Sequence, residues 1–375
     1  MRISVPKETR PGENRVALVP DIISKLTRAG LEVVIESGAG VSAQFSDEQF
    51  TKAGATVKSG NVISDSDVVA SIQPLTPDQM KSLKKGTITI SFLSPTTAVD
   101  SIEAAASAGA TALSLELVPR ISRAQSMDAL TSQALCAGYR ATLAAAELSP
   151  RFFPLLMTAA GTVTPANVVI LGAGVAGLQA IATAKRLGAV VSAYDVRPAS
   201  ADEVKSMGAK FITLELEALE GQGGYAREMT EDRAAQQRAL LTPYISAADV
   251  LITTAAVPGR PAPRLVTADM IATMQPGSVV VDLASETGGN VEGTMPGEII
   301  TTANGVKMWG GKDVPSQLPF HASMLFSRNV VNLLMLMVKT TDGVATVIPD
   351  FADEIIDAAT VTHGGARRTP EGIKK

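Results

Sequence analysis

A glycine-rich turn between an apolar strand and a helix restricts the possible folds of this chain more than any other segment. The apolar run Val168–Leu171 predicts a strand, and the spacing GxGxxG of Gly172, Gly174 and Gly177 leads into a predicted helix over Val175–Leu187. The first glycine permits a tight turn, the second lets the backbone approach a pyrophosphate, and the third lets the helix pack on the strand. The N–H groups at the start of that helix can bind phosphates. We therefore expect a dinucleotide-binding βαβ unit.

The end of the next strand, predicted at Val190–Tyr194, indicates which dinucleotide binds. Asp195 lies 18 residues after Gly177. An acidic side chain there accepts hydrogen bonds from a ribose 2′-hydroxyl and repels a 2′-phosphate, so NAD(H) is favoured over NADP(H). Arg197 could in principle meet a 2′-phosphate, but Asp195 occupies the strand terminus itself. The predicted contacts in this region are Gly172, Ala173, Gly174, Val175, Gly177, Asp195, Val196 and Arg197.

Short apolar runs alternate with helical patterns along most of the chain. One series extends from Arg2–Val5 to Thr111–Leu117, and a second from Asn167 to Leu283. Such alternation predicts βαβ units and mostly parallel sheets. The fold class is therefore α/β, with two Rossmann-like parallel-sheet domains.

Two further helices, predicted at Ser126–Leu148 and Ala322–Lys339, bracket the second series. This bracketing indicates that the dinucleotide-binding domain is inserted into the first domain. The expected boundaries are 1–130 plus 316–375 for the first α/β domain and 131–315 for the dinucleotide-binding domain.

Charge and cysteine content narrow the class of protein. The net charge of −4 and the absence of a basic run argue against nucleic-acid binding. The single cysteine, Cys136, cannot form an internal disulfide or a zinc site, and no metal is expected. The start Met1–Glu8 predicts a strand and then charge, not a signal peptide, and Val330–Val338 is too short to span a bilayer. We expect a soluble, cytoplasmic chain without direct membrane insertion.

One dense polar cluster, Arg120–Thr131, lies between the last strand of the first series and the long helix. Ser126 or one of its neighbours could cap this helix, and Asp128 in its first turn would favour the helix dipole. Capping does not account for Arg120, Arg123 and Gln125. Helix capping and ligand binding are therefore equally good interpretations of these residues.

Two other segments leave alternatives open. Glu215–Arg233, with its glycine-rich Gly221–Tyr225, is long for a connection and is either a functional lid or a surface excursion. The small residues of Thr253–Gly259 follow a strand and fit a backbone that passes near a cofactor, or a generic loop. His321 and His363, the only histidines, are better explained as capping or solvated residues than as catalytic ones.

Several stretches together resemble the NAD(H)-binding domain I subunits of proton-translocating transhydrogenases along essentially the whole chain. The most specific is VPRISRAQSMDALTSQ at Val118–Gln133. The others are AGYRATL at Ala137–Leu143, the glycine-rich segment Met157–Ala189, DVRP at Asp195–Pro198, GGYAREM at Gly223–Met229 and VPGRPAPRLVT at Val257–Thr267.

The resemblance implies residue roles. Arg120, Gln125 and Asp128 would be the catalytic polar side chains around the nicotinamide and its ribose. Thr131 stands where the family typically has serine, and its hydroxyl keeps the contact. Tyr225 would lie on a loop that closes over the nucleotide, and Met157–Ala166 would be a dimerisation hairpin. Further implied cofactor contacts are Ile121, Ser122, Ser126, Met127, Gly224, Gln237 and Ala256.

The implied function is hydride transfer between NADH and NADP+ held on a separate subunit, which needs no acid–base residue on this chain. The implied partners are membrane-spanning and NADP(H)-binding transhydrogenase subunits and a second copy of the chain. These partners would attach it peripherally to the inner (cytoplasmic) membrane.

The opening Pro6–Glu8 and Arg15–Leu18 is also similar to alanine dehydrogenase, which requires a substrate-binding lysine and a catalytic histidine. Gln73 stands where the lysine should be, and Ile90–Leu93 contains no histidine. An amino-acid dehydrogenase is the alternative function, and a non-catalytic NAD(H)-sensing module is a third.

Overall fold

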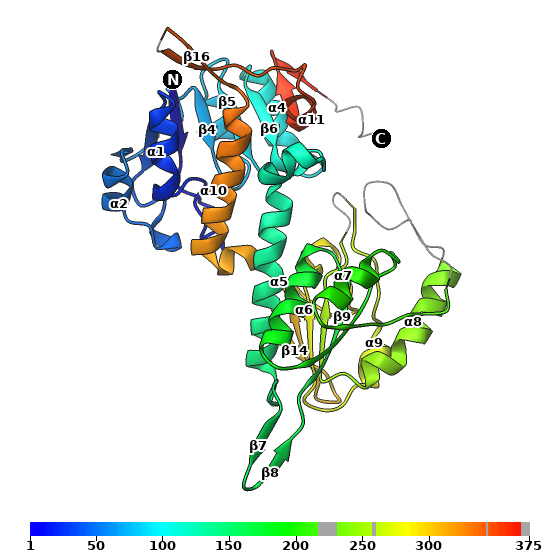
Figure 1. Ribbon diagram of the computed structural model, residues 1–375. Coiled ribbons are helices and arrows are strands. Elements are labelled where there is room, and N and C mark those ends of the chain that lie inside the picture. Colours follow the sequence, from blue (N-terminus) through cyan, green and yellow to red (C-terminus); the bar gives the residue numbers. More distant parts are fainter. Residues whose placement is uncertain (217–230, 257–259, 343, 369–375) are drawn as a thin grey trace. The chain divides into compact units, whose positions relative to one another are not determined.

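The computed structural model describes residues 1–216, 231–256, 260–342 and 344–368 (Figure 1). They form two compact units. Unit 1 contains Met1–Gln133 and the C-terminal segment from Pro315 onward, and unit 2 contains Ala134–Val314. Unit 1 is thus built from both ends of the chain, with unit 2 inserted between them.

Unit 1 contains an eight-stranded sheet in the order β19-β18-β6-β5-β4-β1-β2-β3, in which the six strands from β6 to β3 run parallel. The chain builds β1 to β3 outward on one side and then returns to place β4 beside β1. Burial of apolar side chains on both faces stabilises this sheet. The strands are β1 (Arg2–Val5), β2 (Glu32–Glu36), β3 (Thr56–Lys58), β4 (Val68–Ala70), β5 (Ile88–Ser91), β6 (Thr111–Ser114), β18 (Thr360–His363) and β19 (Ala366–Arg367).

Local capping fixes the short helices of unit 1. Ser46 and Gln49 form a capping box at the start of α2, and Thr76 and Gln79 form another at α3. These helices are too short for periodicity to reveal them, and the sequence did not predict them. The helices are α1 (Pro20–Arg28), α2 (Asp47–Lys52), α3 (Pro77–Lys81), α4 (Val99–Ser107), α10 (Pro319–Met335) and α11 (Glu354–Ala359).

Unit 2 contains a seven-stranded sheet in the order β11-β10-β9-β12-β13-β15-β14, parallel except for β14. The strand order again reverses once, between β9 and β12. Helices α6 (Val175–Arg186), α7 (Ser200–Ser206), α8 (Glu231–Ser246) and α9 (Ala268–Ala272) connect the strands. The strands are β9 (Asn167–Leu171), β10 (Val190–Tyr194), β11 (Lys210–Phe211), β12 (Val250–Thr253), β13 (Val279–Asp282), β14 (Ile299–Thr301) and β15 (Lys307–Gly310).

These two sheets confirm the predicted fold class of two Rossmann-like domains with one inserted in the other. No helix within the described ranges is long and apolar enough to cross a membrane. Strands β7 (Leu156–Thr158) and β8 (Gly161–Val163) form a hairpin where the family resemblance implied one, at Met157–Ala166. A second hairpin, β16 (Val338–Thr341) with β17 (Val344–Val347), was not predicted.

Two predicted helix boundaries were wrong. The helix expected over Ser126–Leu148 is α5 (Ala129–Leu148), which is preceded by a 3₁₀ segment, η3 (Ser122–Met127). Asp128 has an extended backbone between the two and therefore interrupts the helical run. The helix expected over Ala322–Lys339 ends at Met335, because the following residues lead into β16.

Candidate functional site

The glycine turn after β9 is held tightly against the loop after β12. Gly172 has φ of +102°, which favours glycine, and a Cβ there would lie 2.7 Å from Oγ1 of Thr254. A Cβ on Gly177 would lie 1.9 Å from the carbonyl oxygen of Gly172. The Thr254 hydroxyl donates a hydrogen bond of 3.0 Å to that same carbonyl. Neither glycine can be replaced without moving backbone.

Gly174 is different, because a Cβ at this position would meet nothing within 4 Å. Gly174 is the N-cap residue of α6, and no side chain caps the N–H groups of the helix's first turn. Open space beside uncapped N–H groups at a positive helix end suits a phosphate. The turn, including Val175 at the first helical position, therefore fits the pyrophosphate of a dinucleotide.

Asp195 directly follows β10, and its side chain is 8% exposed. Its Oδ2 accepts a hydrogen bond of 2.7 Å from the backbone N–H of Ala173, which fixes it beside the glycine turn. Its Oδ1 accepts bonds of 2.9 Å from both the backbone N–H and the Nε of Arg197. Burial and the charge of Asp195 raise the pKa of the neighbouring Tyr194 hydroxyl to about 12. Val196, also predicted to contact the cofactor, is partly buried against the core.

Asn290, which no sequence pattern singled out, holds the loop after β12. It is fully buried, and its side-chain amide donates to the carbonyls of Ala255 and Pro263 at 2.8 Å each. Its Oδ1 accepts a bond of 3.0 Å from the N–H of Ala255. Only the fold brings a residue 35 positions away against this loop, so no local pattern could have revealed it.

The other residues of unit 2 that were predicted to contact the cofactor differ from one another in exposure. Ala256 is exposed in the loop after β12, and Gln237 is buried on α8. Gly224 and Tyr225 lie outside the described residues, as does most of the Glu215–Arg233 segment.

In unit 1 the polar cluster forms η3 and the start of α5. Asp128 caps α5, because its Oδ1 accepts a bond of 2.8 Å from the N–H of Thr131. Of the residues that could have capped this helix, Asp128 does so and Ser126 does not, because the helix begins at Ala129. The carbonyl of Ser126 instead accepts bonds from the side chains of Asn329 and Asn332 on α10. Arg120, Ser122, Gln125 and Ser126 are exposed, Ile121, Asp128 and Thr131 are half-buried, and Met127 is buried.

The two arginines of the cluster differ in their surroundings. Arg123 makes a two-pronged ion pair with Asp353, with N–O distances of 2.7 and 2.9 Å. The hydrogen bonds from Arg123 hold the pKa of the Asp353 carboxyl below its usual range. Arg123 therefore attaches the cluster to the start of α11, whereas Arg120 has its side chain exposed at the beginning of the cluster.

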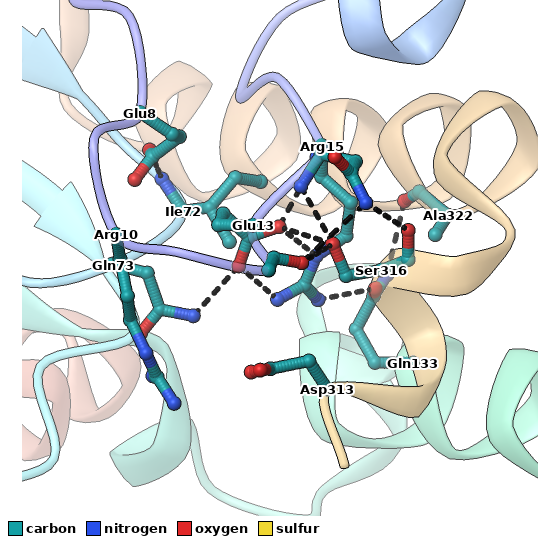
Figure 2. A network of polar contacts seen from close by, with 12 residues as sticks. Glu8, Arg10, Glu13, Arg15, Ile72, Gln73, Gln133, Asp313, Ser316 and Ala322 are labelled. Atoms are coloured by element: carbon teal, nitrogen blue, oxygen red, sulfur yellow. Dashed lines mark hydrogen bonds and ion pairs between the residues drawn. The ribbon is translucent and has the colours of Figure 1, made fainter. Parts of the chain in front are cut away.

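A buried polar network in unit 1 surrounds Glu13 (Figure 2). The Arg15 guanidinium donates to both Glu13 oxygens, at 2.7 and 2.6 Å, and to Oε1 of Gln133 at 2.8 Å. The Gln73 amide donates to Oε2 of Glu13 at 2.7 Å. Burial opposes the charge of Glu13, but the bonds and charge of Arg15 outweigh it and lower the pKa of that carboxyl. The Gln73 side chain therefore has a structural role, as a hydrogen-bond donor to Glu13.

A cavity of about 430 Å³ lies at the carboxyl ends of β1 and β4, lined by Lys7, Glu8, Arg10 and Gln73 among others. Burial raises the pKa of Glu8 to about 7. Ser91 and Leu93, from the stretch where alanine dehydrogenase would need its histidine, are buried.

Comparison with known proteins shows which family this chain belongs to. The alanine dehydrogenase/PNT N-terminal domain matches residues 4–137, and the alanine dehydrogenase/PNT C-terminal domain matches residues 141–370. An NAD(P) transhydrogenase alpha subunit protein of Rhodospirillum rubrum is 46% identical over 98% of this chain and 97% of that protein. An alanine dehydrogenase of Mycobacterium tuberculosis is 31% identical over 79% of this chain and 76% of that protein.

A solved structure gives the same result. The crystal structure of a transhydrogenase from Sinorhizobium meliloti matches with a TM-score of 0.86 and 41% identity, over 99% of each chain. The resemblance drawn from the sequence motifs is confirmed. The chain belongs to the alanine dehydrogenase/PNT family, as an oxidoreductase subunit of the NAD(P) transhydrogenase alpha type.

Proposed function

We propose that this chain binds NAD(H) and passes hydride between NADH and NADP+ held on a separate subunit of a proton-translocating transhydrogenase. The observation that carries the proposal is the pairing of open space at Gly174 with an acidic side chain at Asp195. The first suits a pyrophosphate, and the second suits a ribose with two free hydroxyls. The bound dinucleotide supplies the hydride; the protein supplies orientation and exclusion of water.

Within this proposal, the exposed side chains of Arg120 and Gln125 and the half-buried Asp128 surround the nicotinamide and its ribose. Arg120 presents fixed hydrogen-bond donors, and the Gln125 amide can both donate and accept. Asp128 holds the start of α5 and offers acceptor oxygens beside it. Hydride transfer between two nicotinamides requires positioning rather than proton transfer, which agrees with a segment that lacks a histidine.

The partners follow from the relatives, since the R. rubrum protein is named as an alpha subunit of a transhydrogenase. We propose membrane-spanning and NADP(H)-binding subunits as partners, with this chain peripheral on the cytoplasmic side of the membrane. We also propose a homodimer. The β7–β8 hairpin projects from unit 2 (Figure 1) and exposes Met157, Leu156 and Val163 by 77%, 36% and 41%. Contact with a second copy would cover these apolar side chains.

The alternative function is an amino-acid dehydrogenase of the alanine dehydrogenase type, favoured by the 31% identity to such an enzyme. Gln73 argues against it, because its amide carries no charge and is bonded to Glu13. The test is an assay of hydride transfer from NADH to an NADP+ analogue, with and without the NADP(H)-binding subunit. Activity that needs the partner supports the proposal; oxidation of NADH by pyruvate and ammonia without it would establish the alternative. Tight NADH binding without transfer to any acceptor, even with every partner subunit present, would instead indicate a sensing module.

A further inference from the structure

The cavity of unit 1 lies where the strand order of its sheet reverses. β1 pairs with β2 on one side and with β4 on the other. In open parallel sheets, ligands bind in the crevice outside the carboxyl ends of the strands at such a switch point. The residues that line the cavity come from segments 6–10, 71–79 and 94–101, which follow β1, β4 and β5. The cavity therefore has the position of a ligand site.

Two helices begin at this cavity, and they differ in their capping. α3 has a complete cap, because Thr76 and Gln79 form its capping box. α4 has Ala98 as its N-cap residue, and no side chain caps the N–H groups of its first turn. Asp100 in that turn is exposed and is not among the residues that line the cavity. Uncapped N–H groups at the positive end of a helix favour an anion.

Ser101, in the first turn of α4, gives a second and independent indication of a ligand. It lines the cavity and is only 8% exposed, yet its hydroxyl forms no hydrogen bond to any residue that the structure describes. A buried hydroxyl without a partner is costly. A ligand oxygen in the cavity would accept its hydrogen bond and remove that cost.

The charged side chains around the cavity also favour an anion. Lys7 and Arg10 are exposed cations, and Glu8 is the only carboxylic acid among the described residues that line it. Burial raises the pKa of Glu8 to about 7, so a large fraction of it is uncharged near neutral pH. Glu8 accepts a bond of 2.6 Å from the N–H of Ile72, and Arg10 donates one of 3.0 Å to Gln73 (Figure 2). Even with Glu8 ionised, the lining has a net positive charge.

We propose that this cavity binds a small, polar phosphate monoester, with the first turn of α4 and the Ser101 hydroxyl as donors to the phosphate and Lys7 and Arg10 as its counter-charges. A phosphate has three strong acceptor oxygens and a charge close to −2, which suits several donors from different segments. The volume of about 430 Å³ is typical of a small-molecule pocket, and the hydroxyls of Thr9 and Ser94 suit a hydroxylated remainder. None of these residues belongs to the proposed dinucleotide site, so the assignment goes beyond the proposed function.

Isothermal titration calorimetry of the purified chain tests the site, with inorganic phosphate, glycerol 3-phosphate and pyruvate as separate titrants. Each titration is run with and without saturating NADH, which would occupy the glycine turn of unit 2. We expect both phosphates to bind in the presence of NADH, and glycerol 3-phosphate to bind more tightly than inorganic phosphate. Pyruvate, with a single charge on a planar carboxylate, should bind at least about 10-fold more weakly than glycerol 3-phosphate.

Three variants and a control assign the binding to the cavity. Lys7→Gln removes a charge and Ser101→Ala removes the unpaired hydroxyl, and each should weaken glycerol 3-phosphate binding roughly 10-fold. Glu8→Gln keeps an oxygen for the Ile72 N–H and should strengthen binding severalfold at pH ~8, where the wild-type carboxyl is charged and repels the phosphate. Lys58→Gln, which removes an exposed lysine on β3, should leave binding unaltered.

Three outcomes overturn the proposal. Neither phosphate binds in the presence of NADH; Lys7→Gln and Ser101→Ala both bind glycerol 3-phosphate as tightly as the wild type; or pyruvate binds more tightly than either phosphate, which would assign the cavity to the alternative function. Failure of NADH to bind would refute the proposed function alone. The variants all lie in unit 1 and still report on the cavity, so the two failures are distinguishable.

Discussion

The carboxylate of Asp128 holds Thr131 twice, accepting a bond of 2.8 Å from its backbone N–H and one of 2.6 Å from its hydroxyl. This arrangement ends the 3₁₀ segment η3 and starts α5. A residue that the family resemblance places beside the nicotinamide ribose is therefore also the cap of the longest helix among the described residues. The two roles can be separated, because asparagine caps helices about as well as aspartate.

Asp128→Asn is expected to leave the thermal stability within about 0.5 kcal/mol of wild type while slowing hydride transfer roughly 10-fold, since the cap survives and a charged acceptor is lost. Asp128→Ala is expected to cost about 1 kcal/mol of stability as well. Calorimetry and the two-subunit assay measure the two effects. Equal rates in wild type and Asp128→Asn would remove Asp128 from the nicotinamide site.

The glycine turn offers a matched pair of substitutions. Gly174→Ala adds a methyl group in open space at an ordinary φ of −74°, so the protein should fold normally. It should bind NADH roughly 10-fold or more weakly, because the methyl group separates the phosphate from the helix N–H groups. Gly177→Ala meets the Gly172 carbonyl and should destabilise unit 2 by about 1–3 kcal/mol. Titration and urea denaturation distinguish them; unaltered NADH binding by Gly174→Ala would contradict the proposed phosphate site.

The ion pair of Arg123 and Asp353 allows a double-mutant cycle. Their side chains are 49% and 23% exposed, so water screens the pair and the coupling free energy should be small. Asp353→Ala should cost more than Arg123→Ala, because Asp353 also caps α11 by accepting a bond of 2.9 Å from the N–H of Ile355. Asp353→Asn keeps the cap and should fall between them. Equal costs for the two alanine variants in urea denaturation would show that the cap contributes nothing.

Glu8 should make the stability depend on pH. Burial raises its pKa from 4.5 to about 7, with repulsion from Glu13 adding to the effect. The native protein therefore binds this proton more tightly than the unfolded chain, and its contribution to the unfolding free energy falls as pH rises from about 4.5 to about 7. Glu8→Gln should be more stable than wild type at pH ~8 and similar to it at pH ~4.5. Glu103→Gln, which removes an exposed carboxylate on α4, is the control. A constant difference between Glu8→Gln and wild type across this range would exclude the titration of Glu8 as its cause.

The exposed β7–β8 hairpin is the proposed homodimer interface, so a charge placed on it should weaken the dimer. Met157→Glu puts a charge in the middle of β7 and should weaken the proposed homodimer at least about 10-fold, because a charge buried at an interface is costly. Val344→Glu changes a residue that is 64% exposed on β17 and should leave association unaltered. Sedimentation equilibrium measures both. A dimer of unchanged strength in Met157→Glu would place the interface elsewhere.

The two-sheet architecture and the glycine turn between β9 and α6 could be predicted from the amino-acid sequence. Both depend on local patterns: apolar runs set the strands, and the glycine spacing sets a turn whose geometry involves only a few neighbouring residues. The ends of helices were harder to predict from the sequence. The start of α5, for example, depends on the extended backbone of one residue, Asp128.

The partners of the polar side chains, in contrast, became known only from the folded structure. Arg123 meets Asp353 from 230 residues away, Gln73 meets Glu13 from 60, and Asn290 meets Ala255 from 35. Even Asp195 and Arg197, two residues apart, could be predicted as neighbours but not as an ion pair. A side chain's partner depends on where the folded backbone places competing donors and acceptors, and no local pattern in the sequence contains that information.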